Sequence, residues 1–161
     1  MKMGRKVRNN RGTSVVEFAI VLPLFLMLIL GIIDFGRFFF AQHSLQFATR
    51  EGTRLALVGK TLTDQAGKPM TREASIVQTI QTNASVALDP SQLSINIFPV
   101  QSDYSDPQGW SNQINAGAPG QYMRVRTQYN FVFLTPMIGA LFTGGAIGVK
   151  AEATYRNELF N

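Results

Sequence analysis

Glu17 is the residue of this chain that most needs a chemical partner. Between Val15 and Ile33 the sequence holds no other charged side chain. A carboxylate in a membrane helix is disfavoured by about 2.5–3.5 kcal/mol near mid-bilayer, and by less close to the helix end, as here. Cleavage after Gly12 would create an α-amine on Thr13, one helical turn away, which can pair with Glu17 within one subunit or between packed neighbours. The alternative is a carboxylate that reaches the membrane surface without a partner.

The other polar groups give little support for an active site. The only histidine, His43, has no cluster of metal-binding residues beside it, and the chain has no cysteine. The glycines of residues 143–148 lack the lysine of a phosphate loop, so a turn is expected there. Asp103 and Asp106 lack the spacing and the terminal glutamate of an EF-hand loop. The sequence therefore predicts no enzyme, no cofactor, no metal site and no small-molecule substrate.

The apolar run from Val15 to Ile33 is predicted to form one membrane-spanning helix. Its nineteen residues extend over about 28 Å at 1.5 Å per residue, close to the thickness of the hydrocarbon layer. The run is longer than the core of a secretory signal peptide, and no small-residue cleavage site follows it. Pro23 removes one backbone hydrogen bond and is expected to kink the helix.

The excess positive charge lies wholly in the first twelve residues. The net charge is +5, and residues 1–12 hold five basic and no acidic side chains, whereas residues 13–161 hold ten of each. By the positive-inside rule this places the N-terminus in the cytoplasm and the residues after Ile33 on the other side of the membrane. A basic arm for nucleic acid is the competing interpretation. It is disfavoured because the arm adjoins a membrane helix, so no nucleic-acid partner is predicted.

The helical pattern continues beyond the apolar run to about Val58. Apolar and small residues recur at spacings of three and four along one face, namely Phe38, Ala41, Leu45, Ala48, Gly52 and Leu55. A helix from Ser14 to Val58 would be roughly 68 Å long. Gly31, Gly36 and Gly52 weaken it locally but allow another backbone to approach, so they are either tolerated breaks or packing positions.

A second helix is expected after a loop at residues 60–70. It starts near Thr71 and ends at Asp89-Pro90. Its apolar stripe consists of Val77, Ile80, Ala84 and Leu88, so the helix is amphipathic and can lie on a sheet.

Three stretches alternate with period two, which is typical of β-strands. They are residues 93–97, 122–133 and 147–155. If the last two pair, Glu152 is expected to lie opposite Arg124 or Arg126. The fold class predicted is therefore α+β: a long N-terminal transmembrane and amphipathic helix, a second helix and a small antiparallel sheet.

Two segments between these strands have distinct compositions. Residues 101–120 hold most of the turn-forming residues and predict a long polar loop, in which Trp110 either covers the edge of the domain or anchors a partner. Residues 134–142 are apolar but too short to cross a membrane. They are expected to pack on the long helix or to touch the membrane surface.

The N-terminal motifs resemble a known family. Gly12-Thr-Ser-Val-Val-Glu17-Phe18 is similar to the class III prepilin signal of type IV pilin-like proteins. The run from Arg11 to Pro23, followed by Gly31–Arg37 and Ala48–Arg54, resembles the TadE-like family, whose members are minor pilins or pseudopilins of the tight-adherence (Flp) pilus machinery. The similarity covers about residues 11–58. Flp-type major pilins usually carry tyrosine after the glutamate, so Phe18 favours a minor component.

The resemblance implies a pilin-like subunit of the bacterial inner membrane with a role in pilus assembly and adhesion. It divides the chain into a cytoplasmic leader (1–12), a transmembrane helix with its amphipathic extension (13–59) and a periplasmic α+β domain (60–161). A prepilin peptidase would cut between Gly12 and Thr13 within a signal that includes Glu17 and Phe18. The implied partners are this peptidase, the lipid bilayer, other pilin or pseudopilin subunits and the inner-membrane assembly platform.

Two alternatives stay open. The first is an uncleaved single-pass protein whose outer domain binds envelope components without joining a filament. The second is a membrane-anchored enzyme, which requires titratable groups to cluster in a pocket of the outer domain.

Overall fold

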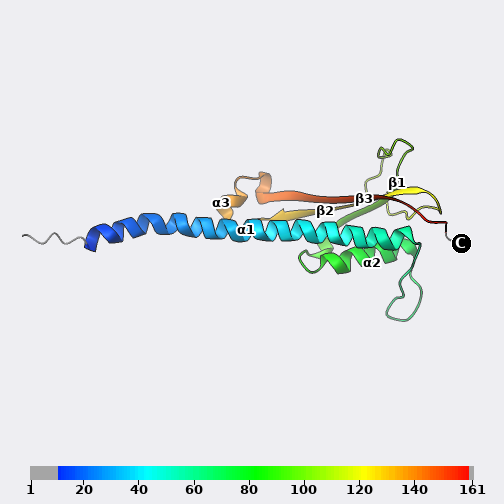
Figure 1. Cartoon of the computed structure of the whole chain (residues 1–161), viewed down its shortest axis with the longest axis horizontal. Coiled ribbons are helices and arrows are strands. Elements are labelled where there is room, and N and C mark those ends of the chain that lie inside the picture. The colour runs from blue at the N-terminus through cyan, green and yellow to red at the C-terminus, as the bar shows by residue number, and fades with distance from the viewer. Residues whose placement is uncertain (1–10, 160–161) are drawn as a thin grey trace, which may run out of the picture.

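The computed structural model describes residues 11–159, so residues 1–10 of the predicted leader lie outside the described part. A long helix runs the length of the molecule, and a small α+β domain packs on its C-terminal half (Figure 1). The predicted fold class is confirmed. The helices are α1 (Arg11–Leu57), α2 (Arg72–Ala84) and α3 (Pro136–Gly139), and the strands are β1 (Ser94–Pro99), β2 (Tyr122–Val132) and β3 (Ala146–Arg156).

Helix α1 has two halves that differ in burial. It continues without a break through Pro23, and among residues 12–40 only Asp34 is buried. From Ala41 onward one face is covered, because Ala41, Leu45 and Ala48 pack in the core of the domain. The N-terminal half therefore projects beyond the domain, as Figure 1 shows.

The sheet is antiparallel in the order β1-β2-β3. Alternate residues of β2 point into the core as predicted, and Met123, Val125 and Thr127 are fully buried. The register of β2 and β3 places Arg126 opposite Glu152, with Arg126 Nη2 at 2.8 Å from Glu152 Oε2. The predicted cross-strand pair is confirmed.

Helix α2 lies beside the C-terminal half of α1 (Figure 1), and Ile76 and Ile80 share one buried cluster with the sheet. The helix starts as predicted, because the Thr71 hydroxyl accepts a hydrogen bond from the Ala74 N–H. It ends at Ala84, earlier than predicted. Asp89 instead caps a following 3₁₀ turn by accepting a hydrogen bond from the Ser91 N–H.

Helix α1 packs tightly against α2 at Gly52. A Cβ atom at this position would lie 2.8 Å from Cδ1 of Ile80 and 3.4 Å from the Ile76 carbonyl oxygen, so either the Ile80 side chain or α2 would have to shift. The same addition at Gly36 meets no atom within 4 Å. The two glycines are therefore a matched pair for testing helix packing.

Gly52→Ala is expected to lower the free energy of unfolding by about 1–3 kcal/mol, because the added methyl overpacks the helix interface. Gly36→Ala is expected to raise it by up to about 1 kcal/mol, because alanine favours the helix and meets no neighbour. Thermal unfolding of the full chain in detergent measures both. In an Ile80→Ala background the cost of Gly52→Ala should fall; an equal response at the two glycines would contradict the close packing.

Strand β1 departs from its predicted pattern. The period-two pattern of residues 93–97 puts Asn96 on the same face as Ser94, which is exposed, but Asn96 is buried together with Ile97 and Phe98. The long loop folds over this face, where Asn96 Oδ1 accepts a hydrogen bond from the Asn112 N–H (2.7 Å) and the Trp110 ring lies 5.2 Å from that of Phe98. Trp110 thus covers the edge region of the domain.

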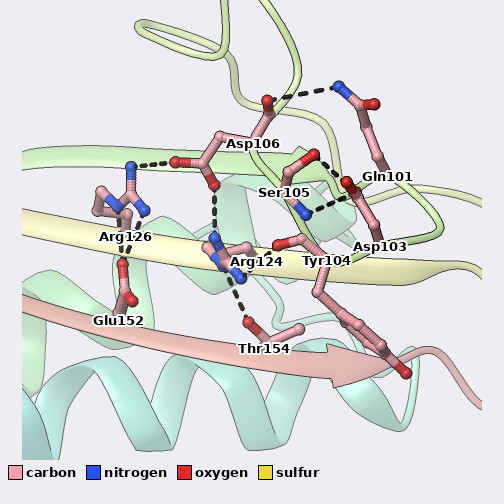
Figure 2. Close-up of polar contacts among 9 residues, drawn as sticks. All are labelled: Gln101, Asp103, Tyr104, Ser105, Asp106, Arg124, Arg126, Glu152 and Thr154. Carbon is pink, nitrogen blue, oxygen red and sulfur yellow. Dashed lines mark hydrogen bonds and ion pairs between the residues drawn. The ribbon is translucent and has the colours of Figure 1, made fainter.

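An ion-pair network fastens the loop to the sheet. Figure 2 shows the Asp106 carboxylate between Arg124 and Arg126, with one oxygen toward each guanidinium. Arg126 also pairs with Glu152 and stacks 4.4 Å from the centre of the Trp110 ring. Because the hydrogen-bond donors of both arginines bind groups of this chain, the network has a structural role: it holds the loop against β2 and β3.

Candidate functional site on the long helix

Most of the exposed large hydrophobic residues in the described part of the chain lie on the N-terminal half of α1. Phe18, Leu24 and Ile32 are each about two-thirds exposed. The helix is long and apolar enough to cross a membrane by length and composition. Soluble proteins rarely expose a continuous apolar patch of this extent. The surface therefore indicates a membrane anchor.

The candidate processing residues lie in the first two turns of α1. Gly12, Thr13, Glu17 and Phe18 are all exposed. Thr13 and Glu17 are four residues apart on a continuous helix and so share a face. Glu17 forms no ion pair within the part of the chain that the structure describes. Its pairing with an amine on Thr13 stays a prediction, because residues 11–13 are continuous here.

The predicted kink and packing residues occupy different environments. Pro23 is exposed inside the unbroken helix. Gly31 faces α3, where its missing Cβ would lie 3.7 Å from Cδ1 of Ile138. Gly52 faces α2, whereas Gly36 has open space around it. Two of the three glycines thus contact other elements of the same subunit.

Asp34 is the residue that sequence reasoning missed. Its side chain is completely buried, although it stands in the exposed half of α1. Its two carboxylate oxygens accept hydrogen bonds from the Leu134 N–H (2.9 Å) and the Thr135 N–H (2.8 Å), at the start of α3. Arg37 Nη1 lies 3.2 Å from the same carboxylate. The two backbone donors and the guanidinium all match an ionised acceptor.

The residues around Asp34 connect α1 to the end of the sheet where β2 leads into β3. Thr135 is the N-cap of α3 but makes no side-chain cap bond, and Asp34 supplies the anion that a helix start favours. Phe35 and Phe38 pack edge-on against Phe133 and Phe131, with ring centres 6.1 and 5.6 Å apart. A buried acid and an aromatic cluster therefore attach the β2–β3 connection to α1, at the C-terminal end of the exposed half of that helix.

A signal for Asp34 was present in the sequence. A carboxylate directly ends the apolar run, and Arg37 follows three residues later. That spacing predicts a weak local ion pair. The backbone groups of residues 134 and 135, however, lie about a hundred positions away in the chain.

Comparison with known proteins gives one match. Residues 12–54 match the family model described as TadE-like protein. The matched segment contains Gly12, Glu17 and Asp34 and most of α1, and it leaves α2 and the sheet outside. No curated protein and no solved structure matches the chain. The resemblance inferred from the N-terminal motifs is therefore confirmed for these residues.

Proposed function

We propose, on the premise that residues 12–54 form a TadE-like segment, that this Tad pilus-associated protein is a membrane-anchored minor pilin or pseudopilin. The observation that carries the proposal is that the matched segment, residues 12–54, contains the whole exposed apolar half of α1. Such a surface requires lipid or the helices of other subunits around it. In this proposal the protein is a subunit that helps to assemble an Flp-type pilus, and through the pilus it contributes to adhesion.

The parts of the chain have separate roles in this proposal. Residues 1–12 are a cytoplasmic leader, residues 13–59 form the membrane helix and its extension, and residues 60–161 form the domain displayed in the periplasm. The five positive charges of the leader keep it on the cytoplasmic side of the inner membrane. Helix α1 packs against other pilin or pseudopilin subunits and meets the assembly platform of the inner membrane.

Processing by a prepilin peptidase requires the helix to open at Gly12. The backbone there is helical, and glycine costs about 1 kcal/mol relative to alanine in a helix interior. Glycine therefore makes it easier for the helix to open at this position. An added Cβ at Gly12 meets no atom of the described residues within 4 Å, so a larger residue is expected to obstruct the peptidase and not the fold that the structure describes.

N-terminal sequencing of the protein extracted from the membranes of its own cells tests this proposal. The expected first residue is Thr13. Gly12→Val should keep the leader, whereas the same change at the other unobstructed glycine, Gly36→Val, should leave cleavage intact. Met1 as the first residue of a protein from piliated cells would contradict the prepilin assignment and favour the uncleaved single-pass alternative.

A further inference from the structure

The connection between β2 and β3 carries an exposed apolar surface that the proposed function does not use. We call residues 132–142 the apolar tip. Val132, Leu134, Met137 and Leu141 are all exposed there, and the Leu141 side chain is 78% exposed. One face of the tip packs on α1 through Ile138, so these four side chains point away from the protein core.

The tip is fixed at a definite height along α1. The Asp34 carboxylate holds the N–H groups of Leu134 and Thr135, and Ile138 packs at Gly31. In Figure 1, α3 lies at the end of the sheet that faces the projecting half of α1. The opposite end of the domain lies near Leu57, whose carbonyl accepts a hydrogen bond from the Glu158 N–H.

The position along α1 where the tip is attached, at Gly31 and Asp34, coincides with the expected membrane surface. The apolar run ends at Ile33, and its length of about 28 Å matches the hydrocarbon layer. Asp34 and Arg37 then stand at the boundary, where charges and head groups meet. The tip lies beside the helix at this level (Figure 1), so its exposed leucines and methionine are at the level of the expected lipid surface. A tip that faced water would leave these apolar side chains without a partner.

We propose that the apolar tip inserts into the periplasmic leaflet of the bilayer that α1 crosses. The occupant of this surface is therefore lipid, at the level of the upper acyl chains. A single helix leaves the domain free to rotate and tilt, whereas a second contact fixes its orientation on the membrane. The inference rests on the proposed membrane anchoring of α1, and its test reports on the two contacts separately.

The absence of cysteine from the chain allows one labelled site at a time in the full-length protein. Leu141→Cys reports on the tip, and Phe25→Cys reports on the membrane helix. Leu159→Cys, at a leucine of the far end that is also highly exposed (87%), is the control. Each variant carries an environment-sensitive fluorophore and is reconstituted, at low protein density, in phosphatidylethanolamine–phosphatidylglycerol vesicles with nitroxide-labelled lipids.

The expected result is strong quenching and a blue-shifted emission at positions 25 and 141, with neither at position 159. Quenching at position 25 together with a water-like signal at position 141 would overturn the tip insertion and leave the anchor intact. An unquenched label at position 25 would overturn the anchoring itself. A blue-shifted emission at position 141 that appears only at high protein density would mean that a neighbouring subunit covers this surface. That result would overturn the proposal.

Discussion

Replacing Asp34 with alanine is expected to detach the apolar tip from α1 and to lower the free energy of unfolding by about 2–4 kcal/mol. The substitution removes the acceptor of two backbone N–H groups, of which the one on Thr135 is buried. It also leaves Arg37 without its carboxylate. The effect is large because the wild-type carboxylate has no access to water and every removed bond is charge-assisted.

Two further variants separate the hydrogen bonds from the charge. Asp34→Asn keeps one acceptor oxygen and turns an amide donor toward the other N–H, so an intermediate loss is expected. Glu51→Ala is the control, because it removes the acid of another i,i+3 ion pair, the one with the largely exposed Arg54. This substitution should lower the free energy of unfolding by less than about 1 kcal/mol. Hydrogen exchange of the Leu134 and Thr135 amides is the measurement. Unchanged protection of these amides in Asp34→Ala would disprove the role of the carboxylate.

The features predictable from sequence were those encoded by local periodicity. The alternation along β2 and β3 identified both strands and limited the residue opposite Glu152 to Arg124 or Arg126, because paired strands with one buried face have few possible registers. The structure selects Arg126. The repeats of three and four in α1 likewise identified the residues that enter the core, such as Leu45 and Ala48. In both cases neighbouring residues in the chain carry the whole signal.

The features that could not be predicted depend on contacts between distant segments. Asn96 reads as an exposed strand position, and only the fold of the long loop places the Asn112 N–H against it. Asp34 reads as the end of an apolar run, and its two backbone partners come from another element. Backbone N–H groups have no residue type, so no sequence pattern marks the donors that such a carboxylate will meet.

The two acids of the projecting half of α1 differ in burial and in their partners. Asp34 is fully buried and bonded within the subunit. Glu17 is exposed and forms no ion pair within the described residues. An acid whose partners are internal stabilises the fold. Glu17 has no ion-pair partner among the described residues, and we expect processing or another subunit to supply one. Substitutions at the two positions should therefore affect different properties.

Glu17→Gln is accordingly expected to abolish pilus assembly while the protein still inserts in the membrane and unfolds at the wild-type temperature. Glutamine keeps the size and polarity of the side chain but loses its charge, so the Thr13 amine of a processed subunit remains as a buried charge without a counter-ion. Leaving one such charge unpaired costs about 3–5 kcal/mol, and the loss recurs at each subunit contact.

Three readouts on the same cells make this test specific: the amount of protein in the membrane, its N-terminal residue, and the amount of assembled pilus. Glu51→Gln is the control on the domain half of α1 and should leave all three unchanged. Loss of the protein from the membrane would mean that Glu17 serves insertion. Normal piliation by Glu17→Gln, with Thr13 as the first residue, would refute the counter-charge between helices and leave Glu17 as a surface carboxylate with no assembly role.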